Sequence, residues 1–306
     1  MSVFVRTGVF VAVYTVLAVP AARAQNRGVY PLGMTATNSG VTPAPGFTYS
    51  NQLLFYGRDA SKDGQGNTVQ TGTNTVVMDM NSFVWVSQKT LLGGARYSMS
   101  ATLPVARNDL TSDVRGNISG GSGFADSYYV PVILGWNKDR FAARAMYGFL
   151  APTGRFHAGA SDNVGSGYWT SAFSSGQTVY ITADKRLAVS AFEMYEYHTE
   201  QSGTGTRPGD TFDLDYSLMR TLGGPASWRT QIGLVGYAAR QTTAKTGPSI
   251  ASADSQARYA VNAIGAAAQF ARLRPGLTLG ARYFKEFANR STFEGFSAQF
   301  LGAIKF

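Results

Sequence analysis

Candidates for catalysis are scarce in this sequence of 306 residues. It contains two histidines, His157 and His198, and no cysteine, which excludes disulfides, thiolate metal sites and cysteine nucleophiles. Asp162 lies near His157, but the pairing is too loose for a hydrolase, and neither histidine has metal-ligand spacing around it. The glycine-rich run 120–123 follows no phosphate-loop pattern and is typical of turns. The sequence therefore predicts no enzyme, no catalytic residue, no bound metal and no cofactor.

Segments of alternating apolar and polar residues fill the chain from Gly46 to its end. The clearest sets one face, Ala95, Tyr97, Met99, Ala101, Leu103 and Val105, against another, Arg96, Ser98, Ser100 and Thr102. A period of two is typical of β-strands whose two faces meet different surroundings. About twelve such segments follow one another, each near the length of roughly nine to eleven residues that a tilted strand needs to cross a bilayer.

The connections between these segments alternate between long and short. Long polar ones occupy residues 58–73, 107–121, 153–165, 199–210, 241–256 and 288–293, and short ones occupy 87–90, 137–139, 183–185, 223–226 and 272–276. Outer-membrane barrels keep long loops outside and short turns in the periplasm, and an even strand number returns both termini to the periplasm. We predict an all-β fold: a transmembrane, antiparallel, up-and-down β-barrel of about twelve strands over residues 46–306, in the bacterial outer membrane. The alternative is a soluble β-sandwich, in which long and short connections are not expected to alternate in this way.

The start of the chain has the features of a secretory signal peptide over residues 1–24. An apolar run from Thr7 to Val19 precedes a small-x-small cleavage site at 22–24. Residues 25–45, rich in Gly, Pro, Thr and Asn, form an amino-terminal segment with no apolar period. Two interpretations of this segment remain: a periplasmic tail, or a plug folded into the barrel through the apolar surface of Tyr30–Gly33.

The formal net charge of +9 could indicate nucleic acid, but lysine and arginine are scattered among acidic residues and form no run. We expect a monomeric barrel in contact with outer-membrane lipids and lipopolysaccharide. The last strand resembles the closing strand of outer-membrane barrels, since one face carries Phe300, Ile304 and the terminal Phe306. We interpret these three residues as the assembly signal for the barrel insertion machinery.

Charged residues occupy the face opposite to the apolar one in many of these segments. If every apolar face meets lipid, the lumen receives Asp79, Arg96, Arg144, Asp213, Asp215, Arg229, Arg258, Arg282 and Glu286. Pairs of opposite sign would narrow the lumen to a selective path, or would only brace it. In the seventh segment, Glu193 and Glu196 differ in parity, so one of them must face the wrong way or sit near an interface.

Several motifs carry a family resemblance that spans nearly the whole mature chain. The strongest are 147–155, YGFLAPTGR, and 162–170, DNVGSGYWT, supported by YPLG at 30–33 and KEF at 285–287. They are similar to the phenol-degradation meta-pathway (MetA-type) outer-membrane proteins, associated with transport of aromatic compounds. The resemblance implies a role like that of fatty-acid channels: passage of small hydrophobic, aromatic molecules across the outer membrane.

The loop 153–165 is our candidate vestibule for such a path, because aromatic side chains flank it. The residues we assign to the substrate path are Tyr147, Phe149, Arg155, Tyr168 and Trp169. The predicted function is passive passage of phenol-like compounds through a narrow, gated barrel. The alternatives are a general diffusion pore for hydrophilic solutes and a structural or adhesive barrel that acts through its loops.

Overall fold

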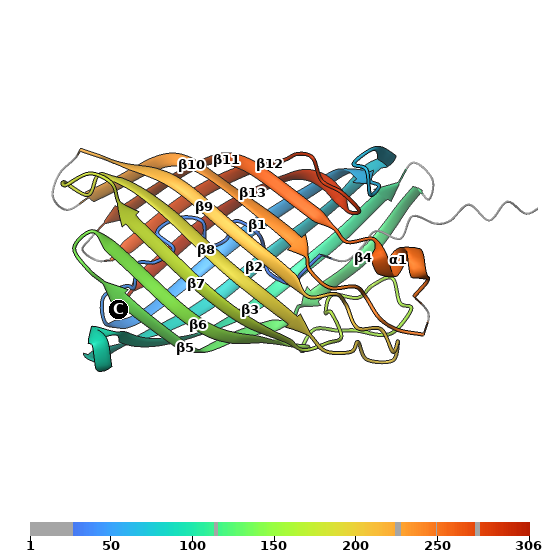
Figure 1. Cartoon of the computed structure of the whole chain (residues 1–306), viewed down its shortest axis with the longest axis horizontal. Helices are drawn as coiled ribbons and strands as arrows, with labels where there is room; N and C mark the ends of the chain where they lie inside the picture. Colours follow the sequence, from blue (N-terminus) through green and yellow to red (C-terminus); the bar gives the residue numbers. More distant parts are fainter. Residues whose placement is uncertain (1–26, 113–115, 224–227, 249, 273–275) are drawn as a thin grey trace, which may run out of the picture.

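The chain forms a closed β-barrel whose strands cross the long axis of the molecule at a tilt (Figure 1). The computed structural model describes residues 27–112, 116–223, 228–248, 250–272 and 276–306; the predicted signal peptide lies outside these ranges. The strands are β1 (Gly46–Lys62), β2 (Thr68–Thr90), β3 (Arg96–Ser112), β4 (Gly116–Phe124), β5 (Ser127–Asn137), β6 (Phe141–Ala151), β7 (Thr170–Tyr180), β8 (Leu187–His198), β9 (Thr211–Leu222), β10 (Trp228–Gln241), β11 (Ala260–Arg272), β12 (Leu277–Glu286) and β13 (Phe293–Lys305).

Antiparallel pairing runs around the whole ring, including β1 with β13 and β2 with β3. Twelve strands close the wall, which confirms the predicted barrel, and β4 is the extra one. β4 pairs with residues 105–112 of β3, whereas β5 pairs with residues 96–102 of the same strand. The stretch 107–121 was expected to be a loop, and it is instead largely a hairpin. Closure pairs the backbone amide and carbonyl groups of the strands, for which the bilayer offers no hydrogen-bond partners.

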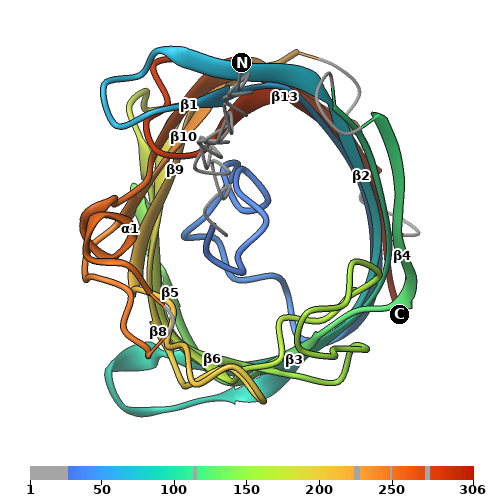
Figure 2. The same ribbon diagram turned by 90° about the vertical axis from the view of Figure 1, so that its right-hand side faces the viewer.

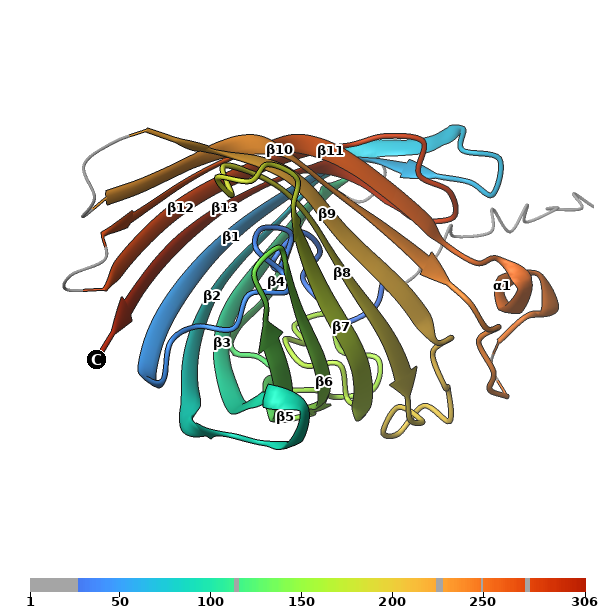
Figure 3. The same cartoon turned by 60° about the vertical axis from the view of Figure 1, so that its left-hand side comes forward.

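The two ends of the barrel differ in their connections (Figure 3). One end has short turns, among them the 3₁₀ turn Leu92–Gly94, and the other has the long loops, one of which holds the short helix α1 (Ser252–Gln256). The start of β1 and the end of β13 lie at the short-turn end, where the Phe306 amide donates to the Phe47 carbonyl (2.9 Å). By the barrel rule this is the periplasmic end. Among the described residues, no helix is long and apolar enough to cross a bilayer.

Most strands turn their apolar face outward, as the alternation predicts. Exposed side chains on this outer face include Met99, Leu234, Tyr283 and Phe300. Two strands reverse the rule. On β2 the inward face carries Met78, Met80 and Val84, and on β11 it carries Val261 and Ala263, both fully buried. The expectation that every apolar face meets lipid is therefore wrong for β2 and β11, because the lumen supplies apolar surroundings of its own.

A bulge in β5 changes the facing of one further strand. The pairing of β5 with β6 shifts between Tyr129 and Val132, across Pro131, which has no amide hydrogen to give to the ladder. The Pro131 carbonyl accepts a hydrogen bond from the Tyr97 hydroxyl (2.6 Å). As a result Tyr128 and Val130 face inward while Val132, of the same parity, is exposed outside.

Residues 27–45, which we call the luminal segment, lie inside the barrel (Figure 2). Ala36 is fully buried and Leu32 packs beside it in an apolar cluster built on β9, β10, β11 and β12. Tyr237 and Phe284 form the wall of this cluster, with ring centroids 5.0 Å apart. Residues 32–36 of the segment therefore pack against one side of the wall.

Candidate functional site: the luminal cavity

Two carboxylates on neighbouring strands hold the first half of the luminal segment. Glu196 on β8 accepts hydrogen bonds from the amides of Val29 (3.0 Å) and Tyr30 (2.8 Å) and from the Thr211 hydroxyl (2.7 Å). Period-two alternation aims Glu196 inward and Glu193 outward, which resolves the ambiguous seventh strand. The charged acceptor offsets the loss of water by these buried amides.

Asp215 on β9 gathers a second group of donors. Its Oδ2 accepts from the Tyr30 hydroxyl (2.6 Å) and the Thr35 amide (3.1 Å), and its Oδ1 from the Gly33 amide (2.8 Å). Gly33 adopts a positive φ of 83°, and a side chain there would collide with Phe284. The tight turn that brings three donors to one carboxylate therefore depends on this glycine.

The start of the described segment is fixed by an ion pair. Arg27 meets Glu286 of β12 at 2.6 Å, and the Glu286 side chain is fully buried. Glu286 also accepts hydrogen bonds from the hydroxyls of Tyr56 (2.7 Å) and Tyr237 (3.0 Å) and from the Asn289 amide (3.0 Å). This many donors are what a buried carboxylate requires.

The second half of the segment is held through its carbonyl groups. Arg282 donates to the Met34 carbonyl (2.9 Å) and the Thr37 hydroxyl (2.9 Å), and Arg144 donates to the Ser39 carbonyl (2.7 Å). On the facing wall, a side chain at Gly135 would collide with Thr42. The segment thus crosses the lumen and approaches the opposite wall before β1 begins.

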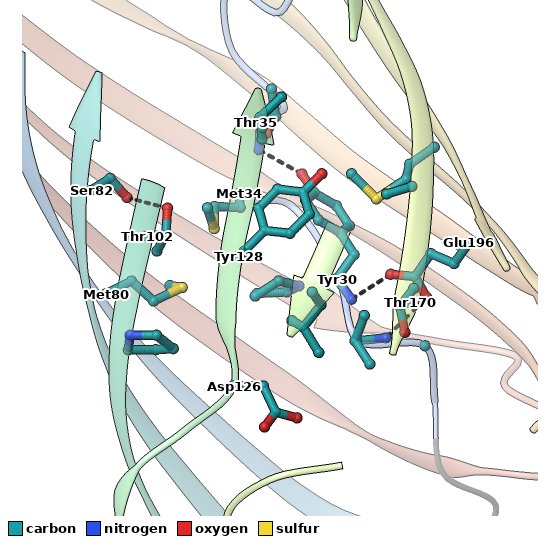
Figure 4. Close-up of a pocket in the computed structure, with 18 of the residues that line it drawn as sticks. Tyr30, Met34, Thr35, Met80, Ser82, Thr102, Asp126, Tyr128, Thr170 and Glu196 are labelled. Carbon is teal, nitrogen blue, oxygen red and sulfur yellow. Dashed lines mark hydrogen bonds between the residues drawn. The ribbon is translucent and has the colours of Figure 1, made fainter. Parts of the chain in front are cut away.

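The space left on the other side of the luminal segment is a cavity of about 760 Å³ (Figure 4). It extends from Asn163 and Gln201 at the long-loop end to Thr42 and Val84 near the short-turn end. Five of the eight methionines line it: Met34, Met78, Met80, Met146 and Met194. A flexible thioether fills irregular apolar space and makes favourable contacts with aromatic rings.

Polar groups on the cavity wall are largely satisfied by the protein itself. The hydroxyls of Ser82 and Thr102 bond each other (2.8 Å). Asp126 accepts from the amides of Gly154 (2.9 Å) and Ser166 (2.6 Å), which ties the loop 153–165 to the rim. A wall of this kind offers apolar surface with a few oriented hydroxyls, as small-molecule sites do.

The predicted luminal charges fall into three groups. Arg144, Asp213, Asp215, Arg282 and Glu286 face the lumen. Arg229 shares the inward parity of Gln231 and is exposed, and Arg96 binds the carbonyls of Ser87 (3.0 Å) and Gln88 at the short-turn end. The remaining two face away from the lumen.

Asp79 and Arg258 contradict the expectation of an inward charge, and both belong to the reversed strands. Asp79 lies on the outer face of β2, where its carboxylate bonds the amide of Asn51 on β1. Arg258 precedes β11 and donates to the Thr242 carbonyl (2.7 Å), exposed in the long-loop region. The reversal that turned apolar residues inward also turned these two outward.

The predicted vestibule residues are also divided. Tyr168 is buried, lines the cavity and packs edge-on against His198. Tyr147, Phe149 and Trp169 lie on the outer face, where Trp169 is 51% exposed and its ring centroid lies 6.0 Å from that of Phe149. Exposed aromatic residues at strand ends are typical of the girdle at the membrane boundary, and these three do not line the cavity.

Arg155 is also outside the cavity, at the surface of the loop. It is half-exposed and pairs with Asp162 at 3.2 Å. The same loop nevertheless reaches the cavity through Phe156 and Val164, which the sequence reasoning missed along with the methionines of β2. The signal that could have found the methionines is the pair of polar residues Asp79 and Asn81, which interrupts the apolar outer face of β2.

The two histidines lie in different surroundings. His157 is exposed in its loop, and His198 is buried with its Nδ1 at 2.8 Å from the Thr170 hydroxyl. Within the described ranges, no three histidine or acidic side chains gather in a way that could hold a metal ion. His198 therefore supports the wall near Glu196.

Comparison with known proteins places this barrel in a family. Residues 58–301 match the family model described as "Putative MetA-pathway of phenol degradation". The chain belongs to this family. The resemblance inferred from the motifs is confirmed. No curated protein sequence matches the chain.

The solved structures that are similar to the barrel include an outer membrane channel and an autotransporter domain. The COG4313 outer membrane channel from Pseudomonas putida F1 superposes with a TM-score of 0.73 at 13% identity, covering 88% of this chain and 98% of that one. The β domain of the Bordetella autotransporter BrkA superposes with a TM-score of 0.52 at 12% identity, covering 86% and 100%. At these identities the likeness shows the fold. This family member has the fold of a bacterial outer-membrane β-barrel.

Proposed function

We propose that this family member is a channel that admits small hydrophobic, aromatic molecules through the cavity beside the luminal segment. The observation that carries the proposal is the reversed face of β2, which lines the lumen with Met78, Met80 and Val84 and leaves Asp79 outside. A charged residue that faces lipid lowers the stability of a barrel in the membrane. The arrangement on β2 therefore favours an apolar lumen at a cost in stability.

The cavity volume of about 760 Å³ falls within the range of roughly 300–1,000 Å³ typical of small-molecule sites. The luminal segment fills the opposite side of the lumen, which argues against a general diffusion pore for hydrophilic solutes. An adhesive barrel acting through its loops has no use for a methionine-lined interior. A protein route for apolar molecules is needed in the outer membrane, because the lipopolysaccharide leaflet resists apolar solutes.

Single-channel recording of the refolded protein in a planar bilayer tests the proposal, with benzyl alcohol as a neutral aromatic blocker. We expect a small conductance that benzyl alcohol reduces. Met80→Trp adds bulk inside the cavity, and we expect the half-blocking concentration to rise about tenfold, because the indole occupies space that the blocker needs; a tenfold change corresponds to about 1.4 kcal/mol of binding free energy. Phe83→Trp, on the outer face of the same strand, is the matched control and should leave block unchanged. A large, steady conductance indifferent to benzyl alcohol would instead show an open pore.

A further inference from the structure

The cavity contains two guanidinium groups that the rest of the described structure leaves without a carboxylate partner. Arg58 on β1 lines the cavity near its long-loop end, and Arg144 on β6 lines it near its short-turn end. The Arg58 Nε is buried and has no hydrogen-bond partner among the described residues. Arg144 donates its Nε to the Ser39 carbonyl, and no ion pair with it is formed within the described ranges. Unpaired buried charge is costly, so these groups call for an external counter-charge.

Arg58 sits in a setting suited to an aromatic anion. Its guanidinium carbon lies 4.5 Å from the Phe293 ring centroid and 5.3 Å from that of Tyr56. The neighbouring Arg27 lies 5.1 Å from the same Tyr56 ring and is already paired with Glu286. Arg27 therefore occupies the nearby carboxylate, and the positive charge of Arg58 remains next to aromatic surface.

The carboxylates near the cavity do not neutralise these arginines. Asp126 and Glu196 both accept backbone amide hydrogen bonds, Asp126 from the loop and Glu196 from the luminal segment. Asp213 lines a separate cavity of about 170 Å³ on the other side of the segment, which Arg58 also borders, and both of its oxygens lack a partner among the described residues. The larger cavity thus has, near each end, a cation without an ion pair among the described residues, a methionine-lined wall between, and two carboxylates that amide donors already occupy.

Resting on the proposed function, we infer that the preferred substrates are monoanionic aromatic acids, compounds that join one carboxylate to an aromatic ring. The ring of such a molecule fits the methionine wall, and its carboxylate accepts bidentate hydrogen bonds from one arginine at a time. Arg58 captures the carboxylate at the outer end, and Arg144 receives it at the periplasmic end. Two separated sites of moderate strength permit release as well as entry.

The test compares benzoate, ionised at neutral pH, with benzyl alcohol, its uncharged counterpart, as blockers of single-channel current. We expect the wild-type protein to be blocked at a lower concentration of benzoate than of benzyl alcohol, and its reversal potential in a salt gradient to show anion preference. Equal or weaker block by benzoate would overturn the inference while leaving the proposed function standing. Block by neither compound would overturn both.

Substitutions of Arg58 and Arg144 test whether these two residues bind benzoate. Arg58→Gln and Arg144→Gln should each raise the half-blocking concentration of benzoate about tenfold, because each loses a charge-assisted hydrogen bond, and should leave benzyl alcohol unaffected. Arg58→Lys and Arg144→Lys keep the charge and should recover part of the benzoate effect. Arg140→Gln, an exposed arginine of a short turn, is the control. Unchanged benzoate block in folded Gln variants would overturn the assignment of these arginines.

Discussion

Asp215→Asn should loosen the luminal segment without disturbing the barrel wall. The Asp215 oxygens take three donors, from Tyr30, Gly33 and Thr35. An asparagine can keep its oxygen in one of the two positions, but its amide group would then face a donor in the other. Losing one charge-assisted bond and weakening the others removes about 3 kcal/mol from the attachment, which raises the detached population roughly 150-fold.

The absence of cysteine from the sequence makes this detachment measurable. Ala36→Cys introduces a single thiol in the segment itself, at a position that is fully buried against the barrel wall while the segment is attached. Labelling by a membrane-impermeant maleimide should be faster in Asp215→Asn than in the parent protein, and heat-modifiable electrophoretic mobility should show that both barrels are folded.

Asp213→Asn is the matched control for this experiment. Asp213 lies two residues away on the same face of β9, and its carboxylate has no hydrogen-bond partner among the described residues. Its replacement should leave the labelling rate of the introduced thiol unchanged. Equal labelling rates in the two asparagine variants would refute the view that hydrogen bonds to Asp215 attach the segment.

The outer face gives two further predictions. Asp79→Leu should raise the free energy of unfolding in lipid vesicles by about 1–2 kcal/mol, because it removes a carboxylate that faces hydrocarbon. Urea titration measures this, and a loss of stability would contradict the lipid-facing placement. Trp169→Ala should lower that same free energy by about 1 kcal/mol through loss of its contact with Phe149, with no effect on block by benzyl alcohol. Weaker block by benzyl alcohol in this variant would show that Trp169 lines the substrate path.

The wall of the barrel was predictable because period-two alternation and the rhythm of the loops are local properties of the sequence. The facing of β2 and β11 was not, because the prediction treated lipid as the only apolar environment. Val261 instead meets the cluster around Ala36, and Met80 meets the cavity. Both environments are created by the luminal segment, whose position depends on contacts with residues more than a hundred positions away, such as Glu196 and Asp215.

The site was predictable only in part, because two of the nine inward charges and three of the four aromatic residues face away from the lumen. Tyr168 and Trp169 are neighbours just before β7, where the parity of a strand end could not be fixed, and they face opposite sides of the wall. The bulge at Pro131 had the same effect on β5, since one inserted residue moves every later side chain to the other face. The extra strand β4 gave no signal because its sequence, GNISGGSGF, is rich in glycine.

The off-centre packing of the luminal segment divides the barrel into two arcs with different tolerance to change. On β9 to β12 the inner residues are committed to Ala36, Leu32 and their neighbours, so a substitution there would release the segment. On β2 and β3 the inner residues border the cavity, so side chains there can change size without releasing the segment, whereas β5 to β8 also hold it through residues such as Arg144 and Glu196. Libraries that seek new cargo should therefore vary only the inner residues of β2 and β3 and leave the first arc unchanged.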